Sequence, residues 1–594
     1  MTSLDLAVVG NCGFGALIDP LARIVWACLP RFDGDPFFSA LLKGNGEPDA
    51  GFWSIDLIDL ESSEQRYRRN SAVLETVLRD VHGGAVRVTD FAPRFRHHDR
   101  MFRPTMLVRK VERIAGTPRI CVRLRPTSEF GAERPLTSRG SNHMRFVTSH
   151  SVMRLTTDAP LTYVASEQSF ALERPLHFLL GPDESLTGSI AGTLEAFLQD
   201  TERYWSDWSR QLSIPFEWQE AVIRSAITLK LCSFDETGGI LAAMTTSIPE
   251  GPDSGRNWDY RYCWLRDAFY TVHALNRLGA TRTMEGFLSY IANIVAGWSG
   301  GDLQPVFGIG LETDLSEQGV ESLAGYRGMG PVRIGNDAFR QIQNDGYGSV
   351  ILASAQSFFD LRVGKPGDVS LFRLLERLGE RAARLWDSPD AGLWELRTRK
   401  SVHTYSSLLC WAGCDRLARI ARQLGLEPEV RHWSETAARI KAGVLERAWN
   451  QRHGAFVQTF GGEDADASLL LMPYLGFLDA ADPRFTGTLA FIEQELKVGG
   501  HLFRYSAPDD FGSPGTAFNV CTFWYIDALA AVGRIEEARA LFNAMLACRN
   551  HVGLLSEDLD PATKELWGNF PQTYSMVGII NSAMRLSMPW EEAF

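Results

Sequence analysis

One short segment of the sequence places a carboxylate between aromatic and aliphatic neighbours. Residues 392–397 read Gly-Leu-Trp-Glu-Leu-Arg, with Trp394 and Glu395 at the centre, and they follow the turn-rich residues 387–390. Apolar neighbours keep water away from a carboxyl group and so favour its protonated form. A protonated carboxyl beside an aromatic wall can deliver a proton to a leaving oxygen as a general acid. A surface glutamate at a loop edge would give the same pattern.

A second candidate carboxylate lies far along the chain, in residues 554–558 (Leu-Leu-Ser-Glu-Asp). We expect Glu395 and Glu557 to face one pocket as general acid and general base. Two carboxyl groups that flank a scissile bond are the usual machinery for hydrolysing a glycosidic linkage. The pair therefore makes hydrolysis of a sugar the first hypothesis to examine.

Aromatic and charged residues alternate between positions 256 and 267, at the start of a predicted helix (Arg-Asn-Trp-Asp-Tyr-Arg-Tyr-Cys-Trp-Leu-Arg-Asp). Aromatic rings stack on sugar rings, while Arg and Asp side chains hydrogen-bond hydroxyl groups in fixed directions. The adjacent Arg266 and Asp267 are suited to hold neighbouring hydroxyls together. A charge network at a helix N-terminus is the structural alternative.

Further mixed blocks lie at residues 325–337, 501–505 and 557–572. The first is rich in glycine, but it lacks the Gly-Lys-Ser/Thr of a phosphate-binding loop and follows no clear strand. Taken one at a time, each block is also compatible with an ordinary structured loop.

The composition is that of a soluble globular protein, with 45% hydrophobic and 22% charged residues among 594. The net charge of −12 gives no reason to expect binding to nucleic acid or to an anionic membrane. We find no signal peptide and no stretch of about 20 apolar residues that could span a membrane, and so expect a cytoplasmic protein. The nine Cys are scattered, which predicts buried free thiols, and neither they nor the 12 His form a metal-binding pattern. No metal is therefore expected.

The periodicity of the sequence changes near residue 200. Before that point, short β-rich runs alternate apolar with polar residues, which predicts an antiparallel β-sandwich with Arg109 and Arg123 on solvated faces. We expect this domain to cover residues 1–190, a linker helix to cover 191–214 and a catalytic helical domain to cover 215–594. The fold class is thus mainly α with an N-terminal all-β domain.

About twelve helices are predicted after residue 215. They are expected near 217–232, 264–278, 282–297, 336–361, 369–386, 403–423, 428–449, 465–477, 484–497, 517–532, 535–548 and 572–586. Six helical hairpins can close into a double-layered (α/α)6 barrel with a loop-lined pocket at one end. A plain bundle or a solenoid is the alternative. The long loops 298–335 and 499–516 are expected to be functional, with Glu317 in the first of them exposed to solvent.

In this order, the blocks resemble glycoside hydrolase family 15, the glucoamylase, glucodextranase and trehalase family of inverting α-glucosidases. Residues 10–11 and 25–33 look like the opening of the N-terminal β-sandwich of its bacterial and archaeal members. The blocks that look like the family's barrel signatures are residues 257–267, 325–336, 392–397 and 555–569. The resemblance covers nearly the whole chain.

The resemblance implies that Glu395 is the general acid and Glu557 the general base. It implies carboxyl groups about 6.5–9.5 Å apart, because inversion needs room for a water between base and sugar. Neither a metal nor an organic cofactor is required. The residues expected to contact the substrate are Tyr260, Trp264, Arg266, Asp267, Arg333, Trp394, Arg504, Tyr505 and Trp567.

The resemblance leaves the substrate open. Our first expectation is a glucoamylase-like enzyme that releases β-glucose from the non-reducing end of short α-linked gluco-oligosaccharides. An α,α-trehalase of the same family is the alternative. A disaccharide phosphorylase on a similar scaffold and a non-enzymatic sugar-binding protein are more distant ones. The only expected partner is the small saccharide substrate, and the sequence predicts no oligomeric state.

Overall fold

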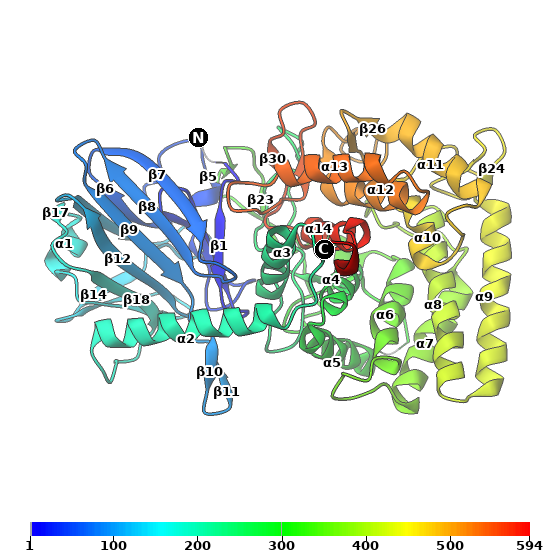
Figure 1. The fold of residues 1–594 in the computed structure, drawn as a ribbon, viewed down its shortest axis with the longest axis horizontal. Helices are drawn as coiled ribbons and strands as arrows, with labels where there is room; N and C mark the ends of the chain where they lie inside the picture. Colours follow the sequence, from blue (N-terminus) through cyan, green and yellow to red (C-terminus); the bar gives the residue numbers. More distant parts are fainter. Residues whose placement is uncertain (1–2, 299, 594) are drawn as a thin grey trace.

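The first part of the chain forms two antiparallel β-sheets that pack face to face (Figure 1). The computed structural model describes residues 3–298 and 300–593. The seven-stranded sheet has the order β1-β2-β3-β6-β13-β17, with β4 added to β3. Its strands are β1 (Ala7–Gly10), β2 (Gly15–Ile18), β3 (Ile24–Cys28), β4 (Pro36–Phe38), β6 (Phe52–Leu57), β13 (Arg119–Arg125) and β17 (Phe170–Ala171).

The eight-stranded sheet has the order β14-β15-β16-β18-β12-β9-β8-β7. Its strands are β7 (Leu60–Tyr67), β8 (Leu74–Asp80), β9 (Ala85–Phe91), β12 (Leu107–Ala115), β14 (Leu136–Arg139), β15 (His143–Val147), β16 (Val152–Thr157) and β18 (Leu176–Pro182). Trp53 of one sheet meets Phe178 of the other edge to face, with ring centroids 6.2 Å apart. The predicted antiparallel sandwich is confirmed.

The expectation for Arg109 was wrong. Its side chain is fully buried between the sheets, where Nε donates to Asp90 Oδ1 at 2.7 Å and Nη1 donates to the carbonyl of Trp53 at 3.0 Å. A buried cation is tolerated only with such partners, and the alternation of residue types cannot reveal them. Arg123 is partly exposed and pairs with Asp56 at 2.5 Å.

Helix α2 (Ile190–Arg210) leaves the sandwich and runs along its lower side in Figure 1. Ser189 caps its N-terminus by accepting a hydrogen bond from the backbone of Gly192 at 3.1 Å. Leu194 and Leu198, one turn apart, face the eight-stranded sheet and pack in a cluster that includes Val108. A short helix, α1 (Leu161–Ser166), lies within the sandwich part.

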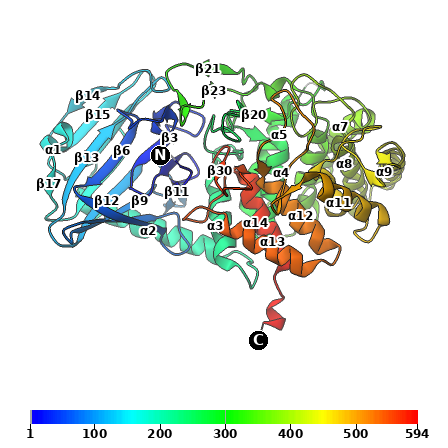
Figure 2. The same cartoon turned by 90° about the horizontal axis from the view of Figure 1, so that it is seen from above.

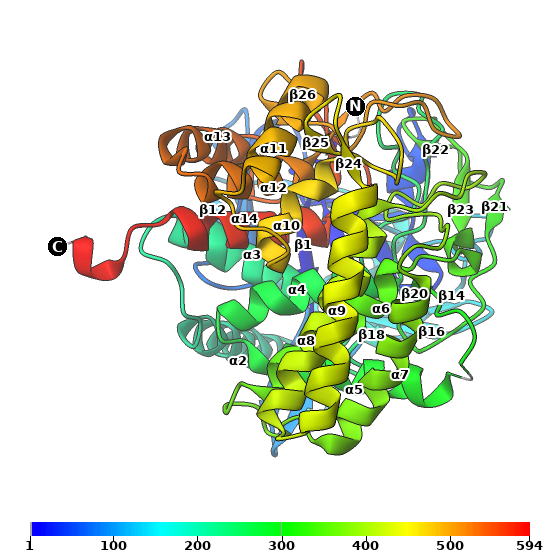
Figure 3. The ribbon, with the colours of Figure 1, turned by 90° about the vertical axis from the view of Figure 1, so that its right-hand side faces the viewer.

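The remaining chain forms the predicted (α/α)6 barrel, which lies beside the sandwich along the long axis of the molecule (Figures 1 and 2). Its inner layer consists of α4 (Leu265–Arg277), α6 (Asp345–Ala355), α8 (Thr404–Gln423), η4 (Ala467–Leu471) with α10 (Met472–Leu475), α12 (Asn519–Ala531) and α14 (Thr573–Leu586). Its outer layer consists of α3 (Gln219–Leu231), α5 (Thr281–Gly297), α7 (Val369–Leu385), α9 (Glu427–Arg447), α11 (Pro483–Leu496) and α13 (Ile535–Ala547). The ring closes where α14 packs on α4, and Figure 3 shows α8 and α9 at the end remote from the sandwich.

Two predicted helices were too long. In the range 336–361, a 3-10 turn η2 (Asp337–Arg340) is followed by an extended Gln341, and α6 begins only at Asp345. The intervening residues form part of the pocket wall described below. In the range 465–477, η4 and α10 are short, and Gly476 ends α10 in the left-handed region at φ 81°.

The N-termini of the inner helices lie at one end of the barrel and carry the functional loops. Trp264, Phe518 and Gln572 each immediately precede an inner helix, and all three line the same pocket. The backbone that leads into these helices is held by short ladders: β19 (Cys263–Trp264) with β20 (Val306–Phe307), and β28 (Ala517–Phe518), β29 (Asp558–Leu559) and β30 (Leu566–Trp567) in one sheet.

The sandwich anchors these loops. β22 (Gly325–Tyr326) of the barrel part pairs in parallel with β5 (Lys43–Gly44) of the sandwich part. Arg261 is fully buried, pairs with Asp259 and donates to the carbonyl of Gly34 at 2.8 Å. Arg261 therefore ties the segment that follows Tyr260 to the N-terminal domain.

Among the described residues, no helix is long and apolar enough to cross a membrane. The expectation of free thiols is confirmed: all nine Cys are free, and only Cys548 is not buried.

Candidate active site

Glu395 lies at the wall of a pocket at the N-terminal end of the inner helices, with its carboxylate held from one side. Its Oε1 accepts hydrogen bonds from Trp264 Nε1 at 2.6 Å and Gln343 Nε2 at 3.2 Å, and Arg266 Nη2 lies at 3.4 Å. The side chain is 24% exposed. Because all three donors contact Oε1, Oε2 is the oxygen that can carry a transferable proton.

The backbone at Glu395 is held in an uncommon conformation. Its φ is 58°, in the left-handed region that costs a non-glycine residue free energy and that clusters at functional sites. Gly392 has a φ of 69°, and a Cβ on this residue would lie 2.7 Å from the ring of His403. The tight turn therefore needs glycine at 392 and presents Glu395 to the pocket.

Glu557 lies directly before strand β29 and is only 2% exposed. Its Oε1 accepts a hydrogen bond from the Tyr260 hydroxyl at 2.7 Å, and its Oε2 has no hydrogen-bond partner among the described residues. Gly568 packs against it, since a Cβ there would lie 2.7 Å from Glu557 Cβ. Tyr260 thus orients the carboxylate and leaves Oε2 available to accept a proton.

Burial raises the pKa of Glu557 well above that of an ordinary glutamate, and the nearby Glu250 and Asp558 carboxylates raise it further. The Tyr260 hydroxyl and the Arg504 guanidinium act in the opposite direction. Burial also raises the pKa of Asp558, the next residue. Glu557 is therefore one member of a buried group of interacting carboxyls.

Arg266 and Asp267, in the first turn of α4, line the pocket. Arg266 Nη1 donates to Gln343 Oε1 at 2.8 Å and to Asp345 Oδ2 at 3.0 Å. Burial raises the pKa of Asp267 to about 7, with Arg266 lowering it and Glu395 raising it. A fixed cation beside a buried carboxyl can supply both donors and an acceptor to sugar hydroxyls.

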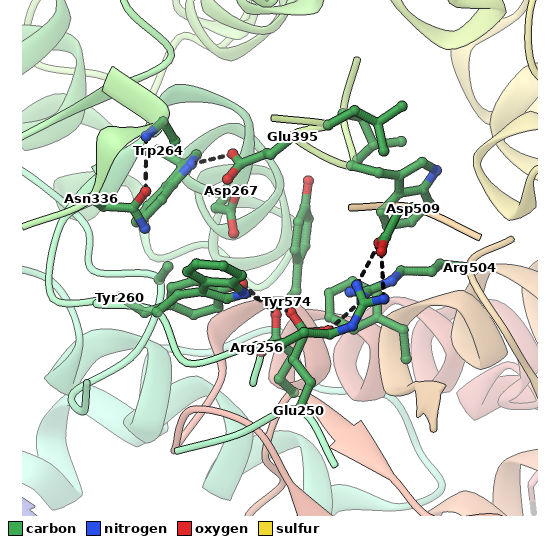
Figure 4. A pocket seen from close by; sticks show the side chains of 18 of the residues that line it. Glu250, Arg256, Tyr260, Trp264, Asp267, Asn336, Glu395, Arg504, Asp509 and Tyr574 are labelled. Atoms are coloured by element: carbon green, nitrogen blue, oxygen red, sulfur yellow. Dashed lines mark hydrogen bonds and ion pairs between the residues drawn. The ribbon is translucent and has the colours of Figure 1, made fainter. Parts of the chain in front are cut away.

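The opposite wall comes from the loop between β27 (His501–Leu502) and β28, together with residues before α4 (Figure 4). Arg256 forms a two-pronged ion pair with Asp509, at 2.5 and 2.6 Å. The Tyr505 hydroxyl donates to the same Asp509 at 2.5 Å, and Arg504 pairs with Glu250. These charged groups are paired with one another and so are held in place before any substrate arrives.

The structure brings most of the predicted site residues together. Those that line this one pocket are Tyr260, Trp264, Arg266, Asp267, Trp394, Glu395, Arg504, Tyr505 and Glu557. Trp394 is positioned by its indole Nε1, which donates to Asp466 Oδ2 at 3.0 Å. Both catalytic candidates therefore face the same space.

Arg333 and Trp567 lie outside the pocket lining. Arg333 pairs with Glu317 at 2.5 Å and sits 5.3 Å from the ring centroid of Trp258, which does line the pocket. Glu317, which we expected to be exposed, is only 7% exposed because Arg333 and Arg397 both pair with it. Trp567 packs against Tyr326, with ring centroids 6.1 Å apart. Neither of these two predicted contact residues therefore lines the pocket.

Several further residues line the pocket. Arg256, Trp258 and Gln572 lie in blocks that the sequence singled out but were not among the expected substrate contacts, whereas Glu250, Gln341, Asp509, Asp510, Phe511 and Tyr574 lie outside those blocks. Asp509, Asp510 and Phe511 belong to the loop 499–516, whose length was the signal that marked it as functional. Glu250 lies in a Pro- and Gly-bounded loop with no such signal. Within residues 3–298 and 300–593, no cluster of His, Cys, Asp and Glu is arranged to hold a metal ion.

Known proteins match nearly the whole chain in sequence and in fold. Residues 4–169 match the family described as "Trehalase-like, N-terminal", and residues 218–584 match "Glycosyl hydrolases family 15". A protein named trehalase from Thermoplasma volcanium is 32% identical over 97% of this chain and 92% of its own. One from Mycobacterium tuberculosis is 32% identical over 99% of this chain and 90% of its own. A bacterial glucoamylase in complex with acarbose has the same fold, with a TM-score of 0.69 at 14% identity over 98% of this chain and 94% of that one.

Proposed function

Because the chain belongs to glycosyl hydrolase family 15 and is a glycoside hydrolase, we propose that it hydrolyses α,α-trehalose to two molecules of glucose with inversion at one anomeric carbon. The observation that carries the reaction type is that Glu395 and Glu557 line one pocket, each with one oxygen fixed by donors. The relatives named trehalase match over nearly their whole length, which favours the trehalase alternative over our first, glucoamylase-like, expectation.

The proposed mechanism is a single displacement. Glu395 gives its proton to the oxygen between the two glucose rings, while Glu557 Oε2 takes a proton from a water on the opposite face of the sugar. Trp264 and Arg266 hold Glu395 at Oε1, and Tyr260 holds Glu557 at Oε1. The fixed donors keep both reactive oxygens directed without reorganisation during the reaction.

The loop 506–516 supports a disaccharide as substrate. The Asp510 carboxylate accepts hydrogen bonds from the backbone of Arg397 at 2.6 Å and of Thr398 at 3.3 Å. The Arg256–Asp509 pair closes the same side of the pocket. This side of the pocket thus presents charged donors and acceptors that suit the several hydroxyls of a second glucose.

The test is a comparison of kcat/KM for glucose release from trehalose, maltose, isomaltose and maltotriose. We expect trehalose to be preferred by about 100-fold or more, because a disaccharide that leaves buried polar groups unpaired loses at least that much. Glu557→Gln serves as the inactive control. Faster hydrolysis of maltose would favour the glucoamylase-like function, and release of glucose 1-phosphate only with phosphate would favour a phosphorylase.

A further inference from the structure

Glu250 is buried in the wall of the pocket and is bound on both carboxylate oxygens. It is 4% exposed. Its Oε1 accepts a hydrogen bond from Trp258 Nε1 at 3.0 Å, and its Oε2 pairs with Arg504 Nη2. The Glu250 carboxylate therefore pairs with the Arg504 guanidinium and restricts its rotation inside the buried pocket.

The backbone around Glu250 is fastened to the segments that carry the base. The Thr516 hydroxyl donates to the carbonyl of Glu250 at 2.8 Å, and it also lies 3.1 Å from Asp558 Oδ1. The backbone of Gly568, which packs against Glu557, donates to the carbonyl of Pro249 at 2.8 Å. A displacement of Glu250 would therefore also shift Glu557.

Charged groups from several loops face this part of the pocket. The carboxyls are Glu250, Glu557, Asp558, Asp509 and Glu395, the cations are Arg256, Arg504 and Arg266, and Tyr260 supplies a hydroxyl. Arg256 pairs with Asp509, and Arg266 pairs with Asp345. Arg504 is the cation whose charge lowers the pKa of Glu557. Because Glu250 pairs with Arg504, it determines how strongly the positive charge of Arg504 acts on Glu557.

We propose that Glu250 is a positioning residue of the active site, which holds the Arg504 guanidinium and the Trp258 indole in place and keeps a negative charge beside the general base Glu557. The role rests on the proposed function only in naming Glu557 as the base. Arg504 and Trp258 line the pocket, so the inference also assigns to Glu250 the orientation of two groups that face the sugar.

The sign of the electrical effect follows from the charges. The negative charge of Glu250 raises the pKa of Glu557, and the Arg504 charge lowers it. Without the Glu250 charge, the pKa of Glu557 is no longer raised by that carboxylate. Arg504, which has lost its partner, then lowers the pKa of Glu557 more strongly, so this pKa falls. Because a general base works deprotonated, the acidic limb of the kcat/KM profile then moves to lower pH.

Two substitutions separate charge from position. Glu250→Gln keeps an acceptor for Trp258 but removes the charge, and we expect the acidic limb to move down by about one pH unit or more, with KM raised about tenfold because Arg504 is no longer held. Glu250→Asp keeps the charge on a shorter side chain, so the limb should stay at its wild-type position while KM rises. Glu217→Gln, which breaks the remote Glu217–Arg539 pair, is the matched control.

If Glu250 had only a structural role, its replacement would lower the melting temperature and would lower the activity at all pH values. The acidic limb of the kcat/KM profile would then stay at its wild-type pH. If the acidic limbs of the kcat/KM profiles of Glu250→Gln and the wild type coincide, the proposal is overturned. A carbon-13 NMR titration of the Glu557 carboxyl, assigned with Glu557→Gln, reads the same shift without turnover. This titration keeps the inference testable even if trehalose proves not to be the substrate.

Discussion

Replacing Glu395, the proposed general acid, by glutamine is the most informative single perturbation. The amide oxygen of glutamine can still accept the N–H groups of Trp264 and Gln343, which lie 2.6 and 3.2 Å from Glu395 Oε1. Its NH2 group would take the place of Oε2 but has no acidic proton to transfer. The substitution thus removes the chemistry and keeps most of the contacts.

The size of the effect follows from the role. General acid catalysis contributes about 10²–10⁴-fold, which corresponds to about 2.7–5.5 kcal/mol of transition-state stabilisation. We expect kcat on trehalose to fall by this amount. KM should change little, because the contact that is lost forms in the transition state.

The assay compares trehalose with α-glucosyl fluoride, whose leaving group departs without protonation. Glu395→Gln should lose less than about tenfold on the fluoride, since no general acid is needed there. Glu557→Gln should lose activity on both substrates, because both reactions need the base. Equal losses of Glu395→Gln on trehalose and on the fluoride would refute the assignment of Glu395 as the acid.

Further predictions concern the pH profile and the sandwich core. Because burial and the Glu250 and Asp558 charges raise the pKa of Glu557, the acidic limb of kcat/KM should lie above that of an exposed glutamate, about 4.3. A limb at or below that pH would contradict the buried carboxyl group. Asp90→Ala leaves the fully buried Arg109 without its carboxylate and should lower the free energy of unfolding by about 3–5 kcal/mol in urea. Asp56→Ala, which removes the partner of the partly exposed Arg123, should cost less than about 1 kcal/mol. A similar loss of free energy of unfolding in both variants would contradict the expectation that a buried ion pair is more costly to break than an exposed one.

The two catalytic candidates could be predicted because each lies in a short segment with its own composition. The tryptophan beside Glu395 and the Ser-Glu-Asp run around Glu557 are local signals. The alternating block before α4 likewise marked a candidate sugar-binding segment, and Tyr260 and Trp264 within it donate hydrogen bonds to Glu557 and Glu395. Local composition singled out these segments, and the resemblance to family 15 supplied the expected roles of acid and base.

Other features could not be predicted because they arise where distant segments meet. Glu250 acquires its role from Arg504, which lies 254 positions away in the sequence. Residues 341–344 follow a pattern compatible with helix, but the backbone is diverted so that Gln341 and Gln343 can contact Glu395. Arg109 occupies an alternating strand whose polar position proved to face Asp90 rather than water. Pairwise contacts of this kind leave no periodic signal.

The central claim is inversion with Glu557 as base and Glu395 as acid, and proton NMR of the first products of trehalose hydrolysis tests it most directly. One glucose is attacked by water and the other leaves with its configuration intact. We therefore predict equal initial amounts of β- and α-glucose before mutarotation. Initial formation of α-glucose alone would mean retention, and would contradict the direct attack of water that Glu557 is proposed to drive.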